Sequence, residues 1–262
     1  MRTDKQKRIH HLAMTLKVND GHGYTPDAIE ENYLERAQKM SDELAEKDIR
    51  FLTYLDDEYP QHLADTPDAP RILYVKSVSP LDEIFDKKMV SVVGTGDASL
   101  SGLNTAWNFV CEVPGKPVIV SGLALGIDIK AHNAALTVGR PTIAVLPCGL
   151  DTVYPFAHRQ ITEIIATTRG CALVSPYPPG TAPDAFHFLD RNRVIAGLSE
   201  ATVVVESKAK GGAIVTARLA QSFGRRVFAF PGRIDDIRSA GCNALIAEGT
   251  ARILTRELYD QV

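Results

Sequence analysis

From Met89 onward, short apolar runs alternate strictly with stretches of helical pattern. The runs are rich in Val, Ile and Ala, a composition typical of strands buried on both faces of a sheet. Strands are expected at 90–93, 118–120, 142–146, 172–174, 202–205, 227–230 and 251–254. Helices are expected between them, at 99–112, 125–138, 157–168, 190–198, 212–223 and 241–248. This alternation predicts an α/β fold with a doubly wound, mostly parallel sheet.

The segments before Met89 follow a different pattern. Residues 1–48 are polar, with apolar side chains at helical spacing, which predicts a small helical N-terminal extension. Thr25-Pro26-Asp27 is a candidate helix start, because proline suits the first helical turn. Residues 49–88 are expected to form a lead-in with strands at 49–53 and 69–75 and a linker at 77–88. Residues 89–262 are expected to form the main domain.

Composition narrows the class of protein. Apolar residues make up 45% and charged residues 23% of the 262 residues, as in ordinary globular proteins. No run of about 18 apolar residues is present, so no membrane contact is expected. The basic N-terminus lacks the apolar core of a signal peptide. Cysteines 111, 148, 171 and 242 form no C-x-x-C pair, which favours a reduced, cytoplasmic protein without a metal site.

Charge is distributed unevenly along the chain. Residues 187–233 contain eight Lys and Arg against three Asp and Glu, whereas residues 1–70 contain nine against fifteen. The basic residues Lys208 and Lys210 precede Gly211-Gly212, between a predicted strand and a predicted helix. A glycine-rich loop leading into a helix presents free N–H groups to anions. The segment therefore predicts a phosphate-binding site with an anionic partner.

Two other predicted strands also end in glycine-rich loops. Gly94-Thr95-Gly96 follows the first strand, but the spacing of a dinucleotide fingerprint fails, so NAD is not expected. Ser121-Gly122 follows the second, and its N–H groups suit either a phosphate or a tight turn. Asp128 can cap its helix or orient a neighbouring group. His132, on the same predicted helix, is expected to be packed rather than catalytic.

The remaining candidates also have two interpretations. Phe188, beside the basic segment, suits either base stacking on single-stranded nucleic acid or core packing. Cys148, at a predicted strand end, is expected to be a buried thiol rather than a nucleophile. The sequence contains no G-x-S-x-G, Walker A or H-E-x-x-H motif. That absence favours a binding protein over an enzyme.

Several collinear motifs together resemble the DNA-processing protein A (DprA, also called Smf) family, over roughly residues 50–257. They are SGLALGIDIKAH at 121–132, TIAVLPCGLDTVYP at 142–155, LVSPYPPG at 173–180, RNRVIAGLSEATVVVE at 191–206, GGAIVTARLA at 211–220, VFAFPG at 227–232 and GCNALIAEG at 241–249. One of these motifs alone is a weak signal, whereas the full set in order is specific.

The resemblance implies an extended Rossmann-like domain that binds single-stranded DNA as a homodimer. It implies delivery of that DNA to a RecA-type recombinase, typically in natural transformation, without a cofactor or a reaction. Carried over residue by residue, the DNA-phosphate pocket would use Gly94, Thr95, Ser121, Gly122, Asp128, Phe188, Arg191, Asn192, Arg193, Lys208, Lys210, Gly211, Gly212 and Thr216. No winged-helix tail of the kind some members carry is expected, because the chain ends at Val262.

The sequence departs from the family pattern at three places. Gly96 stands where the family's first turn usually has Arg, and Leu125 stands where a basic residue is common. Gly211 replaces a usual serine. The loss of two positive charges weakens phosphate binding, and Lys208 and Lys210 can offset that loss.

Two other functions remain open. One is a nucleotide-handling enzyme, phosphoribohydrolase-like, on a related fold. The other is a divergent family member that kept the fold as an interaction module.

Overall fold

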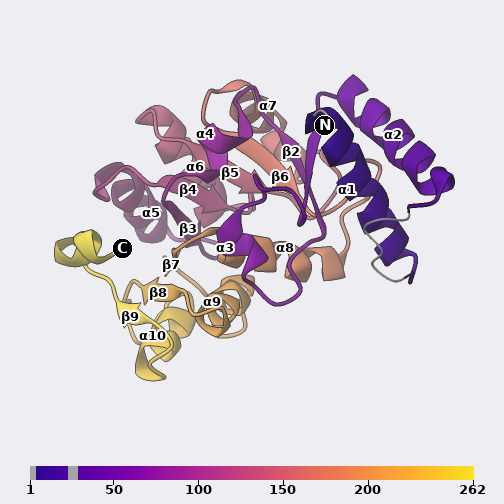
Figure 1. Ribbon diagram of the computed structural model, residues 1–262. Coiled ribbons are helices and arrows are strands. Elements are labelled where there is room, and N and C mark those ends of the chain that lie inside the picture. The colour runs from indigo at the N-terminus through magenta and orange to yellow at the C-terminus, as the bar shows by residue number, and fades with distance from the viewer. Residues whose placement is uncertain (1–3, 23–28) are drawn as a thin grey trace.

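The computed structural model describes residues 4–22 and 29–262, so the helix start expected at Thr25-Pro26-Asp27 lies outside the described residues. One mixed sheet carries the fold (Figure 1). In the described part of the chain its strands are β1 (Arg50–Thr53), β2 (Ile72–Lys76), β3 (Met89–Val93), β4 (Val118–Ser121), β5 (Thr142–Val145), β6 (Ala172–Ser175), β7 (Ala201–Val204), β8 (Arg226–Ala229) and β9 (Arg252–Ile253). Their spatial order is β1-β2-β6-β5-β4-β3-β7-β8-β9.

Helices connect the strands. They are α1 (Asp4–Asn19), α2 (Glu31–Glu46), α3 (Gln61–Ala64), α4 (Leu81–Phe85), α5 (Leu100–Glu112), α6 (Ile127–Thr137), α7 (Arg159–Thr167), α8 (Ala185–Leu198), α9 (Gly212–Ser222) and α10 (Ala240–Ala247), with 3₁₀ turns η1 (Phe156–His158) and η2 (Arg256–Gln261). Between β3 and β8, helices and strands alternate as the sequence predicts. The α/β class and the mostly parallel sheet are therefore confirmed.

The order of the strands positions a binding crevice. Strands β4, β5 and β6 continue the parallel sheet on one side of β3, and β7, β8 and β9 continue it on the other. Among the described strands, β2 and β1, at one edge, are the ones that run antiparallel to their neighbours. The winding thus reverses between β3 and β7. Open α/β sheets bind ligands beyond the carboxyl ends of the strands at such a reversal point.

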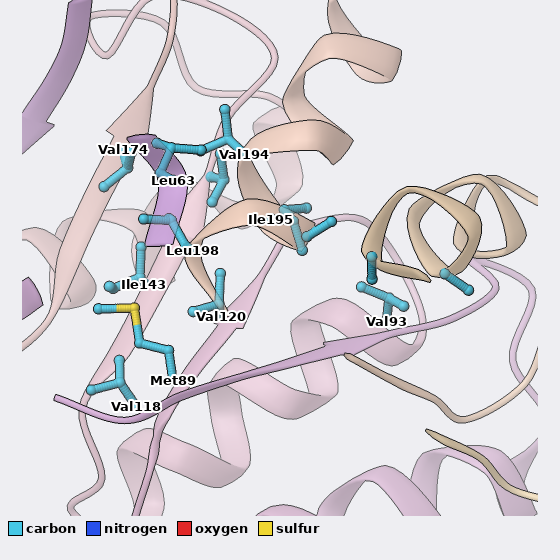
Figure 2. Close-up of a cluster of buried hydrophobic side chains, with 14 of the residues drawn as sticks. Leu63, Met89, Val93, Val118, Val120, Ile143, Val174, Val194, Ile195 and Leu198 are labelled. Atoms are coloured by element: carbon cyan, nitrogen blue, oxygen red, sulfur yellow. The ribbon is translucent and has the colours of Figure 1, made fainter. Parts of the chain in front are cut away.

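Successive side chains of a strand point to opposite faces of the sheet, so they pack in different hydrophobic cores. Val118 and Val120 of β4 pack in the core under α8, whereas Ile119 faces the core under α5 and α6. Figure 2 shows side chains of the first core, with Ile195 and Leu198 of α8 facing the sheet strands. The sheet is therefore packed between two layers of helices.

The N-terminal helices lie together at the β1 end of the molecule (Figure 1). Leu12 of α1 and Ala37 of α2 are completely buried, and both belong to the core that also contains Phe51 of β1. Nδ1 of His11 lies 2.7 Å from a carboxylate oxygen of Asp56, which ties α1 to the loop after β1. The extension is thus packed on the edge of the sheet.

Two expected boundaries are wrong. The linker expected over 77–88 contains the short helix α4, in which Leu81 and Ile84 are buried. The helix expected from 190 begins at Ala185, because the Asp184 side chain accepts a hydrogen bond from the Phe186 amide, at 2.9 Å, and caps it. The earlier start places Phe188 on the helix, three residues before Arg191.

Within residues 4–22 and 29–262, no helix is long and apolar enough to cross a bilayer. The same part of the chain holds no cluster of three or more His, Cys, Asp or Glu side chains suited to a metal ion. All four cysteines are free thiols.

Candidate functional site

A cavity of about 220 Å³ opens at the reversal point of the sheet, beyond the carboxyl ends of β3 and β7. Ten residues that the sequence singles out line it: Gly94, Thr95, Asp128, Phe188, Arg191, Asn192, Lys208, Gly211, Gly212 and Thr216. The lining also includes Val93, Gly96, Ala124, Ile195, Ser207 and Ala213, which were not among the expected site residues. Four segments of the chain, around residues 93–96, 124–128, 188–195 and 207–216, therefore meet at one place.

Larger hollows of about 580 and 660 Å³ lie elsewhere, against the N-terminal helices. Their linings mix Lys and Arg with Asp side chains and include none of the glycine-rich loops. Because phosphate binding needs convergent N–H groups and cations, the smaller cavity is the better candidate despite its size.

The amino terminus of α9 forms one wall of the cavity. Gly211 is its N-cap residue, and no side chain caps this end. The first N–H groups of a helix have no partner within it and carry the positive end of the helix dipole. A Cβ added to Gly212 would meet no atom within 4 Å, so the backbone there is open to a ligand. This wall provides donors for an anion.

Lys208 and Lys210 stand in the loop before α9, and both are exposed. Lys208 lines the cavity, where its Nζ lies 3.4 Å from a carboxylate oxygen of Asp97. Lys210 lies outside the lining, and it forms no ion pair with another described residue. The loop therefore places one cation in the cavity and a second close by in sequence.

Arg191 forms the buried floor of the cavity. Its Nη1 donates to the carbonyl oxygens of Gly122 and, at 3.0 Å, of Val145. Its Nε is buried with no hydrogen-bond partner among the described residues. Burial lowers the pKa of Arg191, an effect that the nearby carboxylate of Asp128 opposes. Arg191 thus braces the loop after β4 while its charge remains under the cavity.

Asp128 lies close to Arg191 and organises the same loop. One of its carboxylate oxygens accepts hydrogen bonds from the amides of Gly122, at 3.2 Å, and Ala124, at 3.4 Å. Burial raises the pKa of Asp128, and the charge of Arg191 acts in the opposite direction. The sequence left two roles open for Asp128, helix capping and orientation of a neighbouring group. Its contacts match the second role, because they orient the loop that contains Gly122 and Ala124.

Phe188 contributes an aromatic wall. Its ring lies 5.7 Å from the Arg191 guanidinium and makes an edge contact, at 5.6 Å between centroids, with Tyr154. Tyr154 is 42% exposed. An aromatic surface beside an anion-binding wall suits a ligand with both phosphates and flat bases.

Three other expected residues lie outside the cavity lining for identifiable reasons. Ser121 is fully buried, and its hydroxyl donates to the Val92 carbonyl at 2.6 Å. Gly122 has its amide on Asp128 and its Cα against Arg191. Arg193 points elsewhere, with Nη1 3.8 Å from a carboxylate oxygen of Asp68, because residues two apart on a helix face different directions.

The first turn, after β3, is closed to a phosphate at the amino terminus of α5. The buried carboxylate of Glu206 accepts hydrogen bonds from the Ser99 amide, at 2.9 Å, and the Ser99 hydroxyl. A Cβ on Gly102 would collide with that carboxylate. In dinucleotide-binding domains this helix terminus holds the pyrophosphate. Here the chain's own carboxylate occupies the position, in agreement with the failed fingerprint.

Cys148 and His132, the side chains considered for catalysis, are packed into the core. Burial raises the pKa of Cys148 to about 11, which keeps the thiol protonated at neutral pH. His132 is fully buried, and burial lowers its pKa to about 3. The hydroxyl of Thr142 donates to the Ile119 carbonyl, so it accepts from Nδ1–H of His132. The surroundings of both side chains match a structural role in the core.

Comparisons with known proteins agree on one family. The family model for DNA recombination-mediator protein A matches residues 50–261. DNA processing protein DprA of Streptococcus pneumoniae is 40% identical over 226 residues, covering 85% of this chain and 78% of that protein. Protein Smf of Synechocystis is 38% identical over 218 residues, covering 82% of this chain and 54% of that protein.

Solved structures give the same result. The X-ray structure of DprA from S. pneumoniae superposes with a TM-score of 0.77 at 34% identity, covering 96% of this chain and 91% of that chain. DNA processing protein A from Helicobacter pylori, described for its single-stranded-DNA binding mode, gives a TM-score of 0.71 at 29% identity, covering 81% of this chain and 95% of that chain.

Proposed function

Because the chain belongs to the DNA recombination-mediator protein A (DprA/Smf) family, we propose that it binds single-stranded DNA at the cavity between β3 and β7. The observation that carries this proposal is the uncapped amino terminus of α9 beside Lys208. The helix N–H groups and the lysine would bind backbone phosphates, and Phe188 would contact bases. Neither kind of contact identifies a base, so we expect little sequence preference.

The cellular role is part of the same proposal. The protein protects incoming single-stranded DNA in the cytoplasm and helps to load a RecA-type recombinase during DNA uptake and natural transformation. It acts as a homodimer and without a cofactor. Family membership supports this role, which depends on the DNA contact proposed for the cavity. Sedimentation velocity tests the dimer, and recombinase filament formation on single-stranded DNA, with and without the protein, tests the loading.

The nucleotide-handling enzyme is less well supported. The Glu206 carboxylate fills the helix terminus after β3, where a nucleotide phosphate would bind. Cys148, the candidate nucleophile, is a buried thiol with a raised pKa. The cavity at α9 remains, and its N–H groups would donate hydrogen bonds to the phosphate of a free nucleotide as well as to that of a strand. Competition by free nucleotides therefore belongs in the test.

The experiment is a fluorescence-anisotropy titration of labelled oligo-dT at two salt concentrations. We compare the wild type with Lys208→Ala/Lys210→Ala and with the control Lys7→Ala/Lys39→Ala, which removes the same charge from α1 and α2. We expect salt-sensitive binding that only the first double variant loses, with the salt slope falling by about 0.7 for each phosphate contact removed. Absence of wild-type binding at low salt contradicts the proposal, and full displacement by mononucleotides favours the enzyme.

A further inference from the structure

The loop between β8 and α10 brings a cation, Arg238, into contact with a residue that adjoins the cavity lining, from a segment that no motif marks. Nε of Arg238 donates to the carbonyl oxygen of Asp97, at 2.8 Å, and its Nη2 lies 3.6 Å from the Asp97 carboxylate. Asp97 directly follows Gly96, which lines the cavity. The Arg238 side chain is 34% exposed and is therefore accessible to a ligand.

The backbone of this loop is fixed to the lysine-bearing loop. The amide of Ser207 donates to the Arg238 carbonyl at 2.7 Å, and the amide of Gly241 donates to the Ser207 carbonyl at 2.8 Å. A Cβ on Gly241 would lie 2.6 Å from the Lys208 carbonyl oxygen, so the two segments are in close contact. The loop that carries Arg238 is thus hydrogen-bonded directly to the loop that carries Lys208.

One exposed carboxylate is shared by the two cations. Asp97 lies 3.4 Å from Nζ of Lys208 and 3.6 Å from Nη2 of Arg238, and its side chain is 63% exposed. Arg238 has a further, longer contact of 3.9 Å with Asp236. Exposed ion pairs of this kind contribute little stability, so an incoming phosphate can replace the carboxylate at small cost.

The first turn itself provides no cation. Thr95 offers a hydroxyl, Gly96 has no side chain, and Asp97 carries a negative charge. Guanidinium groups bind phosphates through paired N–H donors, which makes Arg238 well suited to this edge of the cavity. We propose that Arg238 is a phosphate-binding residue for the DNA strand and that Asp97 is its internal counter-ion, released from Arg238 and Lys208 when a phosphate binds. This inference rests on the proposed function.

The test uses labelled oligo-dT and the full chain with three substitutions, alone and, for Asp97→Asn, combined with Arg238→Ala. Arg238→Ala is compared with Arg233→Ala, which removes an 80% exposed arginine that pairs with Asp235 in the same loop. We expect Arg238→Ala to weaken binding roughly three- to tenfold and to lower the salt slope by about 0.7, and Arg233→Ala to do neither. Asp97→Asn should tighten binding in the wild-type background and have a much smaller effect with Arg238→Ala.

A rescue experiment separates loss of the charge from loss of loop structure. A Cβ on Gly96 would lie 3.6 Å from the Leu125 carbonyl oxygen, an ordinary contact, so an arginine fits there. We expect Gly96→Arg to restore binding to Arg238→Ala. Equal binding by Arg238→Ala and Arg233→Ala, while Lys208→Ala/Lys210→Ala is defective, overturns this inference and leaves the proposed function intact. Absence of wild-type binding overturns both.

Discussion

The guanidinium of Arg191 donates a hydrogen bond to the carbonyl oxygen of Gly122 and lies directly against its Cα. A Cβ at position 122 would overlap Nη1 of Arg191 and come within 2.9 Å of an Asp128 carboxylate oxygen. Glycine at this position therefore makes room for the arginine that braces the cavity floor.

Replacing this glycine should destabilise the fold. We expect Gly122→Ala to lower the free energy of unfolding by about 2–4 kcal/mol, because neither buried neighbour can move without losing hydrogen bonds. Urea unfolding measures the change. Gly212→Ala is the matched control, since its Cβ would meet no atom within 4 Å. Equal effects of the two substitutions would contradict the packing argument.

Arg191 itself should be more important for stability than an exposed DNA-binding arginine. Its removal leaves the buried carboxylate of Asp128 without its neighbouring positive charge. We expect Arg191→Ala to cost about 3–5 kcal/mol, the usual penalty for an unpaired buried charge. Asp128→Asn in the same chain should recover part of that loss in a double-mutant cycle monitored by urea unfolding. Strict additivity of the two substitutions would show that they do not interact.

His132 should make stability fall in mild acid. The folded chain keeps this side chain neutral, with a pKa of about 3, whereas the unfolded chain takes up a proton below about pH 6.5. A depressed pKa means that the unfolded state binds more protons, so stability is lost as the pH decreases from about 6.5 toward 3. The loss between pH 7 and pH 5 should be about 2 kcal/mol.

The measurement is urea unfolding at both pH values, for wild type, His132→Asn and His62→Asn. The asparagine amide can still donate to the Thr142 hydroxyl but does not titrate. The pH-dependent difference should shrink by about 2 kcal/mol in His132→Asn. The His62→Asn variant, which replaces an exposed histidine on α3, is the control for exchanging histidine for asparagine. An unchanged pH dependence in His132→Asn would rule out this origin.

A basic residue in place of Leu125 should strengthen DNA binding. Leu125 is 55% exposed and adjoins the cavity-lining Ala124, at a position where the family commonly has a basic residue. We expect Leu125→Arg to tighten oligo-dT binding by roughly three- to tenfold and to steepen the salt slope by about 0.7. Leu125→Gln controls for the loss of the apolar side chain. Equal affinities of the two variants would place the strand away from this loop.

Most of the fold could be predicted from local pattern, because buried parallel strands are apolar runs and their carboxyl ends gather at one edge. The rule marked the loops at Gly94 and Lys208 one by one, and the family resemblance implied that they share one pocket. The pairing of β2 with β6 was not predictable, since antiparallel contact between distant segments leaves no local signal. The short helix α4 was missed because five residues show too little periodicity.

The site was predicted less completely because side-chain direction depends on packing. Ser121 and Gly122 share a loop with Ala124, yet only Ala124 lines the cavity. Helical spacing already separates Arg193 from Arg191, and applying it would have excluded Arg193. Arg238 had no such signal, because its place at Asp97 follows from backbone contacts between loops more than thirty residues apart in sequence.

Glu206 has a consequence for how such a protein would respond inside a cell. Its carboxylate permanently occupies the helix terminus from which related folds sense soluble cofactors. We expect DNA affinity to be insensitive to NAD and similar dinucleotides at that terminus, since the carboxylate fills the place of their pyrophosphate. The amino terminus of α9 is then the place at which a free nucleotide would compete with the strand.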